Sequence, residues 1–216
     1  MPPGAPTRPS SASPPPTPGS PPPSHSIPIL TSQSPAERSQ PRIPFAHALL
    51  SFYPPGAEIG LVPCAGGGST LTDWARGSRL YSQLVRRTKE SVYGGGCEIK
   101  AVIWFHGKSD ALSEEATATA AYGSRMKKFI GDLRRPRFVD LRFDLGIGCN
   151  FVGDEGLVEK VREAQLGMDL TGVICVDSLG LQLNDDGIHL TTQGQIELGR
   201  MLTEAYVYNF VRPTQQ

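Results

Sequence analysis

From residue 58 onward, short apolar runs alternate with amphipathic segments, and this alternation constrains the fold more than any other feature. The apolar runs predict strands at 58–63 (EIGLVP), 98–105 (EIKAVIWF), 138–147 (FVDLRFDLGI) and 172–177 (GVICVD). The amphipathic segments predict helices at 78–90, 113–133, 155–168 and 192–210. Strands that alternate with helices through short links form a parallel sheet covered on both faces. The sequence therefore predicts an α/β protein with three layers.

The start of the chain differs in composition from the remainder of its 216 residues. Residues 1–26 are mostly Pro, Ser, Gly and Thr, and the first acidic residue is Glu37. Such a segment has little to bury, so we expect a disordered extension at 1–26 and one folded domain at 27–216. The same composition also fits a plastid transit peptide, although a low-complexity extension explains it as well.

Charge and cysteine content exclude several kinds of partner. The 21 acidic and 21 basic residues give a formal net charge of zero, which predicts neither nucleic acid nor a membrane surface as partner. The four cysteines form no C-x-x-C pair, so we expect no zinc site. No signal-peptide core or N-x-S/T sequon is present, so the default location is intracellular, with a plastid or secreted location left open. We expect a monomer.

In parallel α/β sheets, ligands bind beyond the carboxyl ends of the strands. The segments that follow the predicted strands are therefore the candidate site, and they read CAGGGST (64–70), HGKSD (106–110), GIGCN (146–150) and SLGLQLNDDGIHL (178–190). In the last of them, Asp186 and His189 are spaced so that a carboxylate can orient an imidazole, which is the arrangement of a general base. A helix cap beside a polar loop residue gives the same spacing.

Two of the other segments also carry candidate site residues. Gly66, Gly67 and Gly68 allow backbone N–H groups to approach a ligand oxygen, as an oxyanion hole requires, although a tight turn into a helix explains them equally well. His106 could donate an N–H to an oxyanion, and Lys108 could pair with a carboxylate or face water. For Ser109 and Asp110 a helix-capping role is the preferred interpretation, and Trp74 and Trp104 are expected to pack in the core or at the rim.

The segments 62–91, 98–111 and 160–199 resemble the plant members of the sialate O-acetylesterase/carbohydrate esterase family, which are SGNH hydrolases. The resemblance extends over about residues 41–210. It implies a flavodoxin-like sheet of about five parallel strands, acetylated carbohydrate as substrate, and no metal or organic cofactor. It also implies that His189 activates a serine, that Asp186 orients His189, and that Gly67 donates its N–H to the oxyanion.

This sequence departs from the family pattern in two blocks. The block Gln-Gly-Glu-Ser-Asp reads HGKSD here, so His106 would replace the Gln amide in the oxyanion hole. Lys108 replaces Glu and reverses a charge, so that it could stabilise an oxyanion or compete for Asp186. The nucleophile block Gly-Gln-Ser-Asn-Met is matched only by SQSP (32–35), which makes Ser34 the candidate nucleophile.

The first strand is the weakest element of this expectation. Residues 27–30 would form it at the centre of the sheet, but Pro28 lacks a ladder donor there, so we predict a central strand that is degenerate or missing. Relative to the family, a stretch is missing between Arg38 and Ser39. Three interpretations stay open: an acetylesterase that uses Ser34, His189 and Asp186, a catalytically inactive sugar-binding relative, and a truncated gene product.

Overall fold

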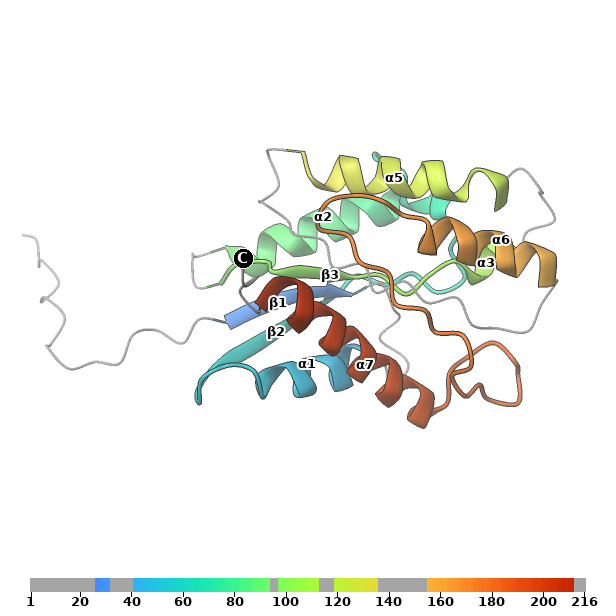
Figure 1. Cartoon of the computed structure of the whole chain (residues 1–216). Helices are drawn as coiled ribbons and strands as arrows, with labels where there is room; N and C mark the ends of the chain where they lie inside the picture. Colours follow the sequence, from blue (N-terminus) through green and yellow to red (C-terminus); the bar gives the residue numbers. More distant parts are fainter. Residues whose placement is uncertain (1–25, 32–40, 94–96, 113–118, 136–154, 212–216) are drawn as a thin grey trace, which may run out of the picture.

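The computed structural model describes residues 26–31, 41–93, 97–112, 119–135 and 155–211 (Figure 1). Three of the sequence-based expectations lie outside these ranges: the extension expected before residue 26, the strand predicted at 138–147 and the candidate nucleophile Ser34.

In the described part of the chain, parallel strands form a three-stranded sheet in the order β2-β1-β3. The strands are β1 (Ser26–Thr31), β2 (Glu58–Pro63) and β3 (Ala101–Ile103). β1 pairs with β2 along its whole length, whereas β3 pairs only with the residues from Ile29 to Thr31. The predicted bounds of the strand at 58–63 are confirmed.

The prediction that the central first strand is degenerate or missing is wrong, because β1 lies between the two other strands. The prediction overestimated the effect of Pro28. This residue lies opposite Gly60 of β2, but it precedes the segment that pairs with β3. A proline at a position with a partner on one side only removes less of the hydrogen-bond ladder than a proline between two paired neighbours.

Helices cover both faces of the sheet (Figure 1). On one face lie α1 (Arg42–Leu50) and α7 (Thr192–Tyr206), which continues as the π-helical turn η2 (Val207–Val211). On the other lie α2 (Arg79–Val92), α5 (Tyr122–Leu133) and α6 (Glu155–Leu166), with the short elements η1 (Leu71–Trp74) and α3 (Lys108–Ala111). None of the helices in the described ranges has both the length and the apolar character that a membrane span needs.

Side chains alternate between two buried clusters, one on each face of the sheet. The first cluster includes Trp74, Leu84, Val102, Trp104, Met126 and Phe129, and the second includes Phe45, Leu49, Ala101, Ile103, Phe105 and Leu198. Residues 101–105 thus change faces at every step, as an extended chain does. Trp74 and Trp104 are fully buried with ring centroids 5.0 Å apart, which confirms their predicted packing role.

No strand is assigned at the predicted position 172–177, although the side chains there behave as in a strand. Val173 and Cys175 pack against the first cluster, and Val176 belongs to the second, so the alternation has a period of two. A strand needs a hydrogen-bonded neighbour. The strand predicted at 138–147, which precedes this segment along the chain, lies outside the described residues.

The sequence did not predict α1, and its contact with α7 is unusually close. A Cβ atom at Gly199 would lie 2.6 Å from Cβ of Pro44 and 2.8 Å from the carbonyl oxygen of Pro41. The hydroxyl of Thr203, one turn further along α7, donates to the carbonyl of Phe45 at 3.2 Å. Gly199 is therefore required by helix packing.

We expect Gly199→Ala to destabilise the protein by about 1–3 kcal/mol, because the added methyl group meets backbone and a proline ring that cannot move aside. Urea unfolding measures this change. The matched control is Gly131→Ala on the exposed side of α5, where a Cβ would meet nothing within 4 Å. There the helix propensity of alanine should stabilise the fold by up to about 1 kcal/mol. Equal effects of the two substitutions would contradict the packing role.

Candidate active site

The turn at 184–189 is held by hydrogen bonds between its own residues. The N–H of Asn184 donates to the carbonyl of His189 at 2.7 Å, and the N–H of Gly187 donates to the carbonyl of Asn184 at 2.9 Å. Gly187 has a φ of 65°, a backbone conformation that glycine adopts without strain. Leu183 and Leu190 close the turn through an antiparallel bridge just before α7 begins. The sequence NDDGIH thus forms a compact loop at the rim.

This loop joins Asp186 and His189 as the sequence predicts. Nδ1 of His189 lies 2.7 Å from Oδ2 of Asp186, while Oδ1 accepts the N–H groups of Ile188 at 2.8 Å and of His189 at 2.9 Å. The N–H of His189, its ring and the N–H of Ile188 hold the pKa of the Asp186 carboxyl well below its usual range. The carboxylate therefore stays charged and fixes Nδ1. Proton exchange with a reacting group then falls to Nε2.

The glycine-rich turn that follows β2 leaves Gly67 exposed. A Cβ atom at Gly67 would meet nothing within 4 Å, whereas one at Gly66 would lie 2.9 Å from Cδ1 of Leu80. Gly66 thus packs closely against the Leu80 side chain, whereas Gly67 is accessible to a ligand. Donation of its N–H to an oxyanion stays a prediction.

His106 is buried beneath this turn, with only 7% of its side chain exposed. Its Nε2 lies 3.4 Å from the hydroxyl of Ser69, which also accepts the indole N–H of Trp74 at 2.9 Å and donates to the carbonyl of Gly66 at 2.7 Å. Burial lowers the pKa of His106 to about 4, so the ring is neutral at physiological pH. An oxyanion role for His106 stays a prediction, and it requires Nε2 to carry the proton and to turn from Ser69 toward the ligand.

Asp110 links two turns of the rim. Its carboxylate is fully buried and accepts the N–H of Leu71 at 3.1 and 3.0 Å. Burial raises the pKa of Asp110 to about 6, and the bond from Leu71 opposes the rise. A helix-capping role was the preferred interpretation for this residue, but Asp110 lies inside α3 and ties that helix to η1 instead.

The structure gives Lys108 a contact that the sequence did not predict. Its ammonium donates to the carbonyl of Ile188, in the turn that carries His189, and lies 5.3 Å from the centre of the Phe105 ring. This contact joins α3 to the turn at 184–189, and a pairing of Lys108 with Asp186 stays a prediction. No pattern in the sequence indicates the contact with Ile188, because the two residues are 80 positions apart.

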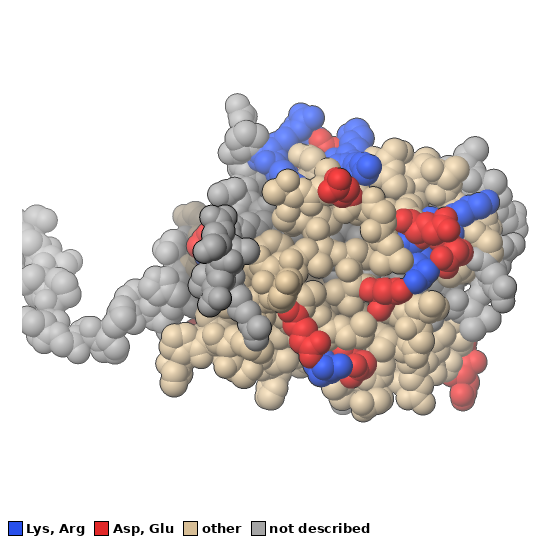
Figure 2. Space-filling view, in the orientation of Figure 1, with Lys and Arg blue, Asp and Glu red and all other residues tan. Residues whose placement is uncertain are grey.

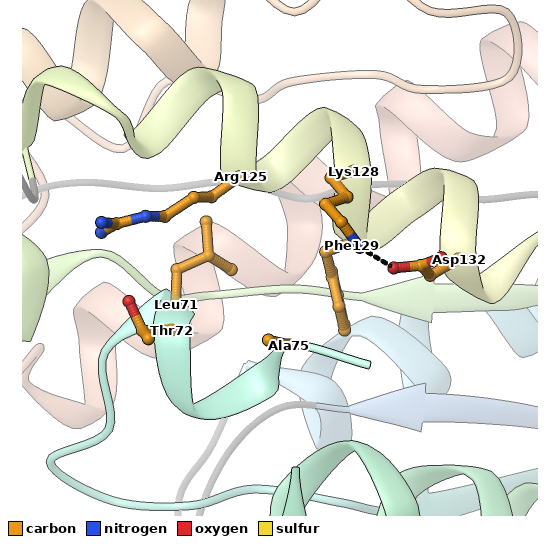
Figure 3. A pocket seen from close by; sticks show the side chains of 7 residues that line it. All are labelled: Leu71, Thr72, Ala75, Arg125, Lys128, Phe129 and Asp132. Carbon is orange, nitrogen blue, oxygen red and sulfur yellow. Dashed lines mark hydrogen bonds and ion pairs between the residues drawn. The ribbon is translucent and has the colours of Figure 1, made fainter. Parts of the chain in front are cut away.

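A separate pocket of about 100 Å³ lies between η1 and α5 (Figure 3). Its lining combines apolar side chains with two cations and an acid, and consists of Leu71, Thr72, Ala75, Arg125, Lys128, Phe129 and Asp132. Lys128 and Asp132 pair at 2.7 Å on its margin. None of these residues belongs to the turn of Asp186 and His189.

Within the described residues, neither surface charge nor a metal-binding group helps to locate the site. Acidic and basic side chains are interspersed over the face drawn in Figure 2. Within the described residues, no group of three or more His, Cys, Asp or Glu side chains could hold a metal ion.

Solved structures with a similar fold are esterases. Est24, a carbohydrate acetylesterase from Sinorhizobium meliloti, is 17% identical with a TM-score of 0.57, and the match covers 86% of this chain and 100% of Est24. At this identity the similarity shows the α/β fold alone.

Sequence similarity then defines the family. Residues 22–208 match the family described as "Carbohydrate esterase, sialic acid-specific acetylesterase", and the chain belongs to this family. The "Probable carbohydrate esterase At4g34215" of Arabidopsis thaliana is 44% identical over 171 residues, which are 79% of this chain and 64% of that protein. The chain thus spans less than two thirds of this relative's length. The X-ray structure of the Arabidopsis protein superposes with a TM-score of 0.71, over 79% of this chain and 68% of that one.

The buried imidazole of His106 predicts a pH dependence of stability. Its pKa is about 4 in the folded protein and about 6.5 when unfolded, so between these values the unfolded chain binds the additional proton. Stability is therefore lost as the pH falls through this window. His106→Gln removes this titration but keeps a polar side chain.

Urea unfolding at about pH 7 and at about pH 4.5 measures the free energy of unfolding of both proteins. Between the two pH values the wild type should lose about 2 kcal/mol more of this free energy than His106→Gln, because each pH unit in the window contributes at most about 1.4 kcal/mol. The comparison cancels titrating groups that are distant from His106. Asp110 is not among them, because its carboxylate lies 3.6 Å from Nδ1 of His106, and its raised pKa acts with the opposite sign. Parallel losses in the two proteins would show that His106 is not buried in its neutral form.

Proposed function

We propose that this chain hydrolyses O-acetyl esters of carbohydrates by acyl transfer to a serine. One observation carries the proposal: His189 and Asp186 form an ordered pair, with Nδ1 2.7 Å from the carboxylate, at the rim where α/β proteins bind ligands. Membership of a carbohydrate esterase family and the names of its relatives support the substrate class.

In the proposed mechanism Ser34 is the nucleophile. Nε2 of His189 takes the Ser34 proton as Oγ attacks the acetyl carbonyl, and the N–H of Gly67 stabilises the oxyanion together with His106. The tetrahedral intermediate expels the sugar oxygen, which takes the proton from His189 and leaves as a hydroxyl, and an acetyl-serine remains. A water molecule then attacks with His189 as base, and acetate leaves. Asp186 stabilises the imidazolium in both steps.

A catalytically inactive sugar-binding protein is the second candidate. It is favoured by the altered nucleophile block, in which Ser32 and Pro35 replace the Gly and Asn that flank the nucleophile in the resembled family. Such a protein would keep the rim turns and lose acyl transfer. Removal of one member of a catalytic triad lowers the rate by several orders of magnitude, about a thousandfold or more.

For the esterase we expect hydrolysis of 4-nitrophenyl acetate that falls at least about a thousandfold in His189→Ala, Ser34→Ala and Asp186→Asn. The assay measures kcat/KM for each variant. His47→Ala is the matched control, because His47 is an exposed histidine on α1 outside the rim, and it should keep wild-type activity. Equal rates in all variants would contradict the proposal.

Labelling with a fluorophosphonate distinguishes the two candidates. The esterase should be labelled at Ser34, and the label should be lost in Ser34→Ala. A protein that binds acetylated oligosaccharide in calorimetry, yet takes no label at any serine, would instead be the sugar-binding relative. Mapping of the labelled peptide also tests Ser69, which lies 3.4 Å from His106.

A further inference from the structure

The peptide group between Ile188 and His189 is held from both sides. Its N–H, which belongs to His189, donates to Oδ1 of Asp186 at 2.9 Å. Its carbonyl, which belongs to Ile188, accepts from the ammonium of Lys108. The orientation of this peptide plane sets the direction in which the His189 side chain leaves the backbone, so Asp186 and Lys108 together constrain the imidazole.

Lys108 is suited to this contact by its place in the fold. It is the first residue of α3, directly after Gly107, whose φ of 123° turns the chain away from the line of β3. The ammonium also lies over the face of Phe105, an arrangement that attracts a cation and limits its rotamers. This hydrogen bond therefore links α3 to the turn at 184–189. The other hydrogen bonds of the turn are largely between its own residues.

The loop needs such an anchor because it is exposed. About half of the His189 and Asp186 side chains, 52% and 45%, is accessible to solvent. Exposed turns open locally at a lower free-energy cost than core elements do. A charge-assisted hydrogen bond to a backbone carbonyl opposes that opening more strongly than a neutral one would.

We propose that Lys108 is a positioning residue for His189, which holds the base in place through the carbonyl of Ile188. The expected change in kcat rests on the proposed esterase function, whereas the expected change in amide exchange does not. Lys108 stands where the resembled family has Glu, and a carboxylate cannot donate to a carbonyl. This chain would thus fix its base by a contact that the family pattern does not provide.

The test uses the full chain with Lys108→Met, which keeps the stem and removes the ammonium, and Lys108→Arg, which keeps a cationic donor. NMR amide exchange at Ile188 and His189 should be faster by about tenfold in Lys108→Met, with α7 amides unchanged, and close to wild type in Lys108→Arg. With 4-nitrophenyl acetate, kcat should fall about tenfold in Lys108→Met while KM changes by less than about twofold. Lys100→Met is the control, because Lys100 pairs with Glu98 on the surface.

Unchanged amide exchange in Lys108→Met would overturn the proposal, as would faster exchange throughout the chain, which would mean a general loss of stability. A rise in KM at constant kcat would also overturn it, because Lys108 would then contact the substrate. If Lys108→Met does not fold, Lys108→Leu, which likewise carries no donor, replaces it with the same expected results. A wild type without esterase activity would contradict the proposed function, whereas the exchange measurement would still decide the role of Lys108.

Discussion

The strict alternation of residues 101–105 between two core clusters is the constraint on which the rim depends. Positions 102 and 104 belong to the first cluster, and positions 101, 103 and 105 to the second. His106 continues the face of Trp104, and the two rings lie 5.1 Å apart, which explains why this histidine is buried. Because both faces of the strand are packed, the start of the segment that carries Gly107 and Lys108 is anchored in the core. The packing of the core thereby helps to place the neighbours of the turn at 184–189.

Much of the fold was predictable from periodicity, and the failures have physical causes. The strand at 58–63 and the helices from 78, 155 and 192 were found because each has a regular apolar pattern of sufficient length. The four-residue η1 is too short to show a period, and α1 is placed by its contact with Gly199 rather than by its own pattern. The effect of Pro28 was not predictable, because a propensity rule does not show how far each neighbouring strand extends.

The candidate site, too, was predictable where its contacts are local in the sequence and not where they join distant residues. Asp186 and His189 were predictable because their geometry is made within a single turn by residues three positions apart. The partners of His106, Lys108 and Asp110 lie 37, 80 and 39 positions away in the sequence. The motifs identified these three as important, but they indicated a local capping role for Asp110 and no contact between Lys108 and Ile188. Only the arrangement of the turns at the end of the sheet shows that His106, Lys108 and Asp110 connect these turns to one another.

The burial of both tryptophans beneath the rim has a practical consequence. Trp74 and Trp104 are the only two tryptophans of the chain, and both are fully buried. The indole N–H of Trp74 reaches the same Ser69 hydroxyl that faces His106, and the ring of Trp104 packs on that histidine. The intrinsic fluorescence of this protein therefore originates directly under the glycine turn. Its emission provides an optical probe of that region, without any dye or engineered label.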